Sequence, residues 1–194
     1  MTNLLKYHTF IPYEDKDRTL ALLDLLEQIY LSDDPLSKNY SKKNFDLDNQ
    51  LAVTFGTIDD EIVLLSTLYQ NPYYGSNKAR TMNRVWKAQS LRAPTFGKYI
   101  KDSDITSLSI VPIHLEIALQ HKIDSIFISI EGAAKRYLSY LSNKLSDVTN
   151  YKWHILENQI DVTGTGSMQH ITYCHLNPTL LSQTSKQQEI FTFI

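Results

Sequence analysis

Between residues 81 and 132, the spacing of the hydrophobic residues changes from that of a strand to that of a helix and back to that of a strand. The other predicted elements are arranged around this stretch. Residues 81–91 read as a strand, and an irregular run follows them to residue 102. A helical stripe comes next, and then an apolar run at residues 125–130 that reads as a second strand. The stripe consists of Ile105, Leu108, Val111, Leu115 and Ala118. This order predicts a βαβ unit, whose loop and helix start share one crevice where phosphates commonly bind.

The N-terminal part of the pattern predicts a strand, a helix and a β-hairpin. Residues 5–12 alternate and end in proline, which favours a strand. Asp15 or Asp17 can cap the helix that follows, whose stripe is Leu20, Leu23, Leu26 and Tyr30. Residues 50–58 and 61–70 flank an Asp-Asp pair and predict the hairpin. The polar segments 31–50 and 71–80 are expected to be loops.

The C-terminal part predicts one helix and two further strands. Residues 133–145 form the helix, with Tyr137, Leu141 and Lys144 on one side. Residues 151–157 and 170–176 are expected to be an antiparallel pair, separated by a loop that contains two glycines. The tail at 177–194 is polar until its apolar last five residues, which we expect to pack on the domain or on a partner.

Composition narrows the class of protein. With 194 residues, 42% hydrophobic and 21% charged, the chain is expected to be a single globular domain. A formal charge of −2 gives no general attraction to nucleic acid or to an anionic membrane. One cysteine, Cys174, suits a reducing compartment and more often belongs to a core than to a catalytic site. Because no apolar run is long enough for a membrane span and no signal peptide is seen, we expect a cytoplasmic protein.

The order of these elements resembles the GNAT (GCN5-related N-acetyltransferase) superfamily over roughly residues 4–176. Three passages carry the resemblance: QLAVTFGTIDDEIVLLSTLYQNP, TMNRVWKAQSLR and HLEIALQHKIDSIFISIEGAAKRYLSYL. It implies an α/β (α+β) fold with a GNAT-like mixed, mostly antiparallel sheet of six to seven strands flanked by helices. It also implies a GNAT-like domain at 1–176 followed by a C-terminal tail at 177–194.

The resemblance further implies an acetyl-CoA-dependent N-acyltransferase that acts on an amine of a small molecule or protein. The family's fourth strand and pyrophosphate loop would supply the cofactor site, here Val85, Trp86, Lys87, Ala88, Arg92, Thr95, Phe96, Gly97 and Lys98. This loop has one glycine where the family pattern has two, and Pro94 lacks an N–H donor. The alternative is therefore a catalytically degenerate GNAT-like domain with a binding or assembly role, as a homodimer or with another partner.

The same resemblance implies Tyr137 as the acid that protonates the leaving thiolate, with Tyr140 one turn further on. Tyr137 could equally be a packing residue of an amphipathic helix. Residues 81–101 contain no carboxylate, which leaves Glu131 and Glu61 as candidate bases. The histidines lack metal-ligand spacing, so no metal site is predicted. Pro112 lies either inside the central helix or at its start.

Overall fold

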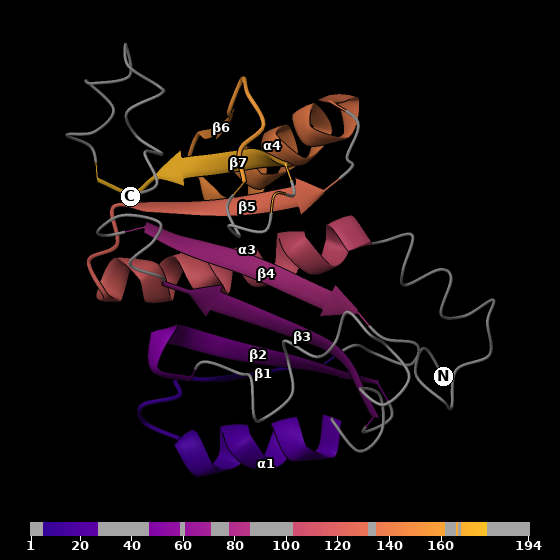
Figure 1. Cartoon of the computed structure of the whole chain (residues 1–194), viewed down its shortest axis with the longest axis vertical. Helices are drawn as coiled ribbons and strands as arrows, with labels where there is room; N and C mark the ends of the chain where they lie inside the picture. Colours follow the sequence, from indigo (N-terminus) through magenta and orange to yellow (C-terminus); the bar gives the residue numbers. More distant parts are fainter. Residues whose placement is uncertain are drawn as a thin grey trace. The chain divides into compact units, whose positions relative to one another are not determined.

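Seven strands form one mixed sheet in the computed structural model of the chain, in the order β1-β2-β3-β4-β5-β7-β6 (Figure 1). Three of the described strand pairings are antiparallel and one, between β4 and β5, is parallel. The structure describes residues 6–26, 47–58, 61–70, 78–85, 103–131, 135–161, 166 and 168–177, some of them by their backbone alone. The predicted class, a mixed and mostly antiparallel sheet with helices, is confirmed.

The chain forms two compact units. One consists of Met1–Thr67 and Asn83–Lys101, the other of Leu68–Met82 and Asp102–Ile194. The boundary runs through β3 and β4, so each unit holds part of both strands. The predicted domain at 1–176 and its tail at 177–194 stay predictions, since residues 178–194 lie outside the described part of the chain.

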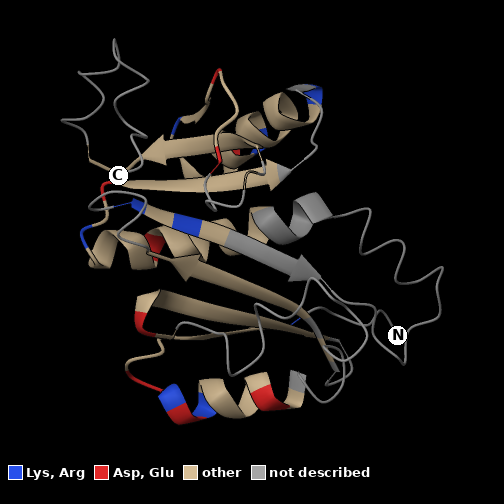
Figure 2. Cartoon of the chain, in the orientation of Figure 1, with Lys and Arg blue, Asp and Glu red and all other residues tan. Residues whose placement is uncertain are grey.

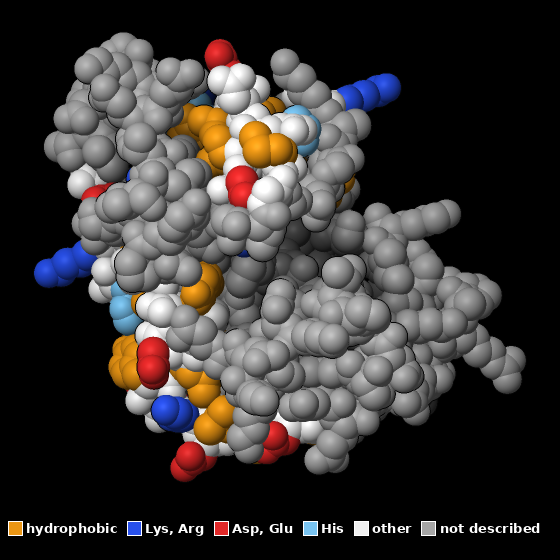
Figure 3. All heavy atoms as spheres, in the orientation of Figure 1, with side chains coloured by type: hydrophobic (Ala, Val, Ile, Leu, Met, Phe, Trp, Pro, Cys, Tyr) orange, Lys and Arg blue, Asp and Glu red, His pale blue; other side chains and the backbone are white. Residues whose placement is uncertain are grey.

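Basic and acidic residues are both present among the described helices, strands and turns in Figure 2, where Lys and Arg are blue and Asp and Glu are red. On the face drawn in Figure 3, the described charged side chains appear singly among hydrophobic and uncharged ones. None of the described helices is both long enough and apolar enough to span a bilayer.

The first unit contains the N-terminal elements that the hydrophobic pattern predicts. They are β1 (Lys6–Phe10), α1 (Lys16–Leu26), β2 (Gln50–Ile58) and most of β3 (Glu61–Tyr69). A 3-10 turn (Leu47–Asn49) within the predicted loop precedes β2. β1 pairs antiparallel with β2, from Lys6 opposite Thr57 to Phe10 opposite Val53. Burial of a shared apolar cluster stabilises the unit, because each of its side chains leaves water on folding. The cluster consists of Phe10, Leu23, Val53, Phe55, Ile62 and Leu65.

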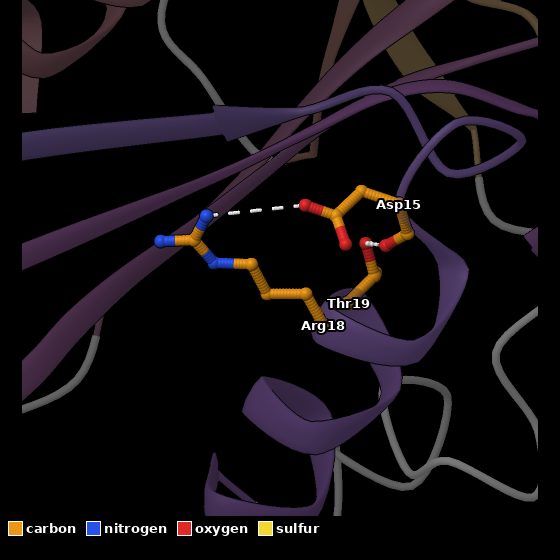
Figure 4. Close-up of polar contacts among 3 residues, drawn as sticks. All are labelled: Asp15, Arg18 and Thr19. Carbon is orange, nitrogen blue, oxygen red and sulfur yellow. Dashed lines mark hydrogen bonds and ion pairs between the residues drawn. The ribbon is translucent and has the colours of Figure 1, made fainter.

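The start of α1 shows how a local signal fixes an element boundary (Figure 4). Asp15 directly precedes the helix, and its carbonyl accepts hydrogen bonds from the backbone N–H of Thr19 at 3.1 Å and from its hydroxyl at 2.9 Å. Arg18 Nη1 lies 3.9 Å from Asp15 Oδ2, while its guanidinium stands 4.7 Å from the centre of the Phe10 ring. Of the two predicted caps, Asp15 is therefore the residue at the helix start.

The second unit contains the predicted βαβ crossover. Its elements are β4 (Lys78–Val85), α3 (Ser103–Gln120), β5 (Ser125–Glu131), α4 (Lys135–Thr149), β6 (Trp153–Ile155) and β7 (Gln169–His175). β4 and β5 are parallel, with Lys78 opposite Ser125 and Thr81 opposite Ile128. β7 pairs antiparallel with both β5 and β6, which confirms the predicted closing pair.

Two sequence-based boundaries in this unit are wrong. β4 begins at Lys78, so the last three residues of the predicted loop at 71–80 belong to the strand. Lys-Ala-Arg has little intrinsic preference for a strand, and its conformation follows from pairing with β5. α4 ends at Thr149, four residues beyond the predicted end at 145, and its predicted start at 133 lies outside the described residues. Lys144 is exposed, whereas Leu141 is buried.

Pro112 lies inside α3, which begins nine residues earlier at Ser103. The alternative that Pro112 starts the helix is therefore wrong. Proline has no N–H, so the carbonyl of Leu108 receives no bond from the residue four positions later. Burial offsets that loss, because the helix places Ile110, Val111 and Ala118 at 0% exposure.

Candidate functional site

The predicted cofactor residues fall almost entirely outside the described part of the chain. Val85 ends β4, and only its backbone is described. The others, Trp86, Lys87, Ala88, Arg92, Thr95, Phe96, Gly97 and Lys98, lie in the undescribed range 86–102. Acetyl-CoA binding by these residues stays a prediction.

Tyr137 lies in the first turn of α4, six residues after the end of β5. It is half-buried, whereas Tyr140 one turn on is 46% exposed. The fully buried positions of this helix are Leu138, Leu141 and Leu145. Tyr137 is thus at the margin of the packed face, and its role as acid stays a prediction.

The two carboxylates considered as bases are placed by their backbones only. Glu131 ends β5 opposite Gln169 of β7, and Glu61 begins β3. Their side chains lie outside the described set. Strand register therefore locates Glu131 beside the first residue of β7.

One face of β4, β5 and β7 carries polar side chains that sequence reasoning missed. Residues directly opposite each other in a sheet point to the same face, and the face alternates along each strand. Arg80 is opposite Phe127, and Phe127 is opposite Tyr173, so the three share a face. Basic residues mark this part of β4 in Figure 2.

The opposite face of these strands packs against α3 and α4. Thr81 Oγ1 of β4 lies 3.4 Å from His114 Nδ1 of α3, and Ser142 Oγ of α4 lies 2.7 Å from Thr172 Oγ1 of β7. Both threonines are opposite Ile128, so the two helices cover one side of the sheet. Arg80 points to the other side.

Arg80 reaches across β5 to β7. Its Nη2 donates a hydrogen bond to Gln169 Oε1 at 3.3 Å, although the two residues are 89 positions apart. Ser129 lies between them, because it is the next residue after Phe127 on this face of β5. Arg80 Nε and Ser129 Oγ are both buried, and neither has a hydrogen-bond partner among the described residues.

The surroundings of these two atoms are apolar. Phe127, Ile171, Tyr173 and Leu156 form a buried cluster, with Tyr69 and Ile160 packed against it. Ser129 is opposite Ile171, and Arg80 is opposite Phe127, so the polar atoms border this cluster. No described carboxylate forms an ion pair with Arg80. The arrangement is a guanidinium and a hydroxyl that can both donate, beside an apolar surface.

A second polar group lies on the same face, nearer the start of β5. Ser125 Oγ and His175 Nδ1 are 2.8 Å apart, which is hydrogen-bond distance. The ring centre of Tyr173 lies 5.5 Å from that of His154 and 5.3 Å from that of His175. Burial lowers the pKa of His175, with further lowering by His154 and Lys78 and an opposing effect of Asp124. Burial, with a smaller effect of Lys152, also lowers the pKa of His154, so both imidazoles are neutral near pH 7. Each has a buried Nε2 with no hydrogen-bond partner among the described residues.

Among the described residues, no group of three or more His, Cys, Asp and Glu side chains is close enough together to hold a metal ion. His170 and His175 lie on opposite faces of β7, as their separation by five residues predicts. His170 Nε2 lies 2.7 Å from Gln159 Nε2.

Cys174 is fully buried on β7, on the helix-covered side. Burial raises the pKa of its thiol far above the usual range, and a hydrogen bond with the backbone of Ile126 only partly opposes this. A neutral, inaccessible thiol is a poor nucleophile, so its interpretation as a core residue is confirmed.

Comparison with known proteins gives matches only at the level of three-dimensional structure. No protein-family model matches the sequence, and no curated protein does. A probable acetyltransferase from Staphylococcus epidermidis is 16% identical, with 90% of this chain and 100% of that chain covered and a TM-score of 0.46. A Bacillus subtilis acetyltransferase in complex with CoA is 18% identical, with the same coverage and a TM-score of 0.43.

The ribosomal-protein-S18-alanine N-acetyltransferase from Escherichia coli is 8% identical, covers 90% of this chain and 95% of its own, and has a TM-score of 0.47. Identities this low concern the fold alone. The strand order and the β4–α3–β5 crossover agree with the GNAT-like fold that the sequence resemblance implies.

Proposed function

We propose that the chain is an acetyl-CoA-dependent N-acyltransferase whose acceptor is an amine. The parallel pair of β4 and β5, joined by α3, is the observation that supports this proposal. Such a crossover brings the carboxyl ends of two strands and the start of a helix to one edge of a sheet, where a phosphate-bearing ligand is favoured. α3 begins at Ser103, five residues after Lys98, so its first N–H groups follow the predicted cofactor loop directly.

Acetyl-CoA would supply the activated acyl group as a thioester. The backbone of β4 around Val85 would align it, and the N–H groups at the start of α3 would bind its pyrophosphate. Tyr137 Oη would donate a proton to the leaving thiolate, since this half-buried position shields it partly from water. Glu131, at the end of β5, would accept a proton from the amine.

A domain that binds without turnover is the second candidate. Pro94 in the predicted loop favours it, because this residue removes one backbone donor from the phosphate site. A binding assay together with a rate assay separates the two candidates.

The experiment measures thermal unfolding with and without acetyl-CoA, and acetyl transfer to a panel of amines, for the parent and for Tyr137→Phe. A ligand that binds only the native state at ~100 times its Kd adds about 2.7 kcal/mol, which raises the melting temperature clearly. We expect Tyr137→Phe to keep that shift while its turnover falls by roughly 10²–10⁴-fold, the usual contribution of general acid catalysis.

Three results would contradict this expectation. A parent that does not respond to millimolar acetyl-CoA would support the non-catalytic domain. Unchanged turnover in Tyr137→Phe would make Tyr137 a packing residue, and Tyr140→Phe would then be the comparison to make. A melting temperature of unliganded Tyr137→Phe well below that of the parent would show that the hydroxyl is structural.

A further inference from the structure

The polar face of the second unit indicates which amines the protein accepts, an inference that rests on the proposed acyl transfer. Arg80 is half-buried, and its only hydrogen bond to a described residue is the one from Nη2 to the neutral amide of Gln169. A charged group held in partly apolar surroundings without a counter-ion destabilises the folded state. Such an arrangement is typical of a site that awaits an anionic ligand, because the ligand supplies the missing charge.

The unsatisfied atoms define what the ligand must offer. Arg80 Nε can only donate, and Ser129 Oγ can donate through its hydroxyl. Both donors require acceptors, and a carboxylate offers two oxygens in a plane that a guanidinium edge can bind. A ligand with an N–H at this position would leave Nε unsatisfied.

Charge and surroundings favour a carboxylate over a phosphate. The site provides one guanidinium and one hydroxyl next to Phe127, Ile171 and Leu156. A phosphate monoester carries nearly two negative charges and three oxygens, which this set of donors would leave partly unpaired. A single negative charge matches the one guanidinium, and the buried cluster beside it is apolar.

We propose that Arg80 and Ser129 bind a carboxylate of the acceptor, so that the preferred substrates are amines that carry a carboxylate close to an apolar side chain. Gln169 holds the guanidinium in place through Nη2, which makes it a positioning residue. Strand register places Glu131 opposite Gln169, so the proposed base and the proposed carboxylate site adjoin on neighbouring strands.

The test separates binding from turnover by using the products of the proposed reaction as probes. N-acetyl-L-leucine carries the carboxylate, whereas N-acetyl-L-leucinamide has the same shape without the charge. We expect the acid to raise the melting temperature of the parent and the amide to have little effect. In Arg80→Gln the affinity for the acid should fall about 10- to 100-fold, the range expected for a lost charged hydrogen bond.

Two further variants keep the outcome interpretable. Lys78→Gln removes a positive charge two residues away on the same face of β4 and should leave the preference for the acid intact. Ser129→Ala should fold as well as the parent, because no described residue bonds the deleted hydroxyl, but should bind the acid more weakly. The unliganded Arg80→Gln should also melt no lower than the parent, since its charge has no counter-ion among the described residues.

Turnover provides the second readout. With leucine and leucinamide as acceptors, we expect the parent to favour leucine in kcat/KM and Arg80→Gln to lose that preference. If the parent binds the acid and amide equally, or if Arg80→Gln keeps the preference, the carboxylate site is wrong even where acetyl transfer occurs. If no amine is acetylated but acid binding still depends on Arg80, the site stands and the proposed reaction fails.

Discussion

His114 is a buried titratable side chain of the described core. It is fully buried on α3, and its Nδ1 lies 3.4 Å from Thr81 Oγ1 of β4. Burial lowers the pKa of His114 from 6.5 to about 3, because the apolar surroundings disfavour the imidazolium. Burial also lowers the pKa of His154 and His175, so all three histidines make the free energy of unfolding fall as the pH falls.

The sign of the pH dependence follows from that direction. Below pH 6.5 the unfolded chain binds a proton at His114 that the folded chain does not, so the free energy of unfolding falls as the pH falls towards 3. For this one group, the loss at pH 5 is about 2 kcal/mol. We expect urea unfolding at pH 7 and pH 5 to show that the stability gap between the parent and His114→Gln shrinks by about that amount.

A matched control for the pH series is His8→Gln, at an exposed position of β1. Its gap to the parent should not shrink in the same way. A gap for His114→Gln that stays constant between the two pH values would show that the buried imidazole is protonated in the folded state.

At the scale of elements, hydrogen bonds of side-chain hydroxyl groups connect α4 to β6 and β7. Ser142 contacts Thr172 of β7, and Trp153 of β6 donates from its backbone N–H to Ser146 Oγ at 3.0 Å. The indole Nε1 of Trp153 donates to Thr149 Oγ1, also at 3.0 Å, and both side chains are buried. A helix and a strand of only three residues are thus connected through side chains as well as apolar packing.

Removing one partner of the indole bond should destabilise the second unit. Thr149→Val keeps the volume but leaves Trp153 Nε1 buried without an acceptor, which we expect to lower the free energy of unfolding by about 1–3 kcal/mol. Trp153→Phe, alone and combined with Thr149→Val, completes a double-mutant cycle in chemical denaturation. If the effects of the two substitutions are additive in that cycle, the hydrogen bond contributes nothing to stability. Asn143→Ala, on the exposed side of α4, is the control substitution.

At the scale of the whole molecule, Cys174 reports on unfolding of the second unit. The thiol is fully buried on β7, and its raised pKa keeps it protonated. We expect a thiol reagent to modify the native chain only when this unit opens, with a rate that rises with urea in step with the loss of circular dichroism. Native-state labelling as fast as in the fully unfolded chain would contradict the burial of Cys174.

The hydrophobic pattern alone was sufficient for the elements whose signal is local. Alternation in residues 5–12, the pair of runs around Asp59-Asp60 and the helical stripe before residue 125 predict β1, β2 with β3, and the crossover. Asp15 at the start of α1 is equally local, since capping depends on neighbours within four residues. These signals, with their order, were enough to predict the GNAT-like fold, although the residues of the cofactor loop remain predictions.

The sequence could not show which distant residues meet. β4 starts at Lys78 because β5 pairs with it, although Lys-Ala-Arg reads as a loop by itself. Arg80 and Gln169 are brought together by the register of three strands, and no spacing in the chain records that register. Whether a charge has a counter-ion depends on every strand packed beside it, so only the tertiary structure decided where the polar face lies.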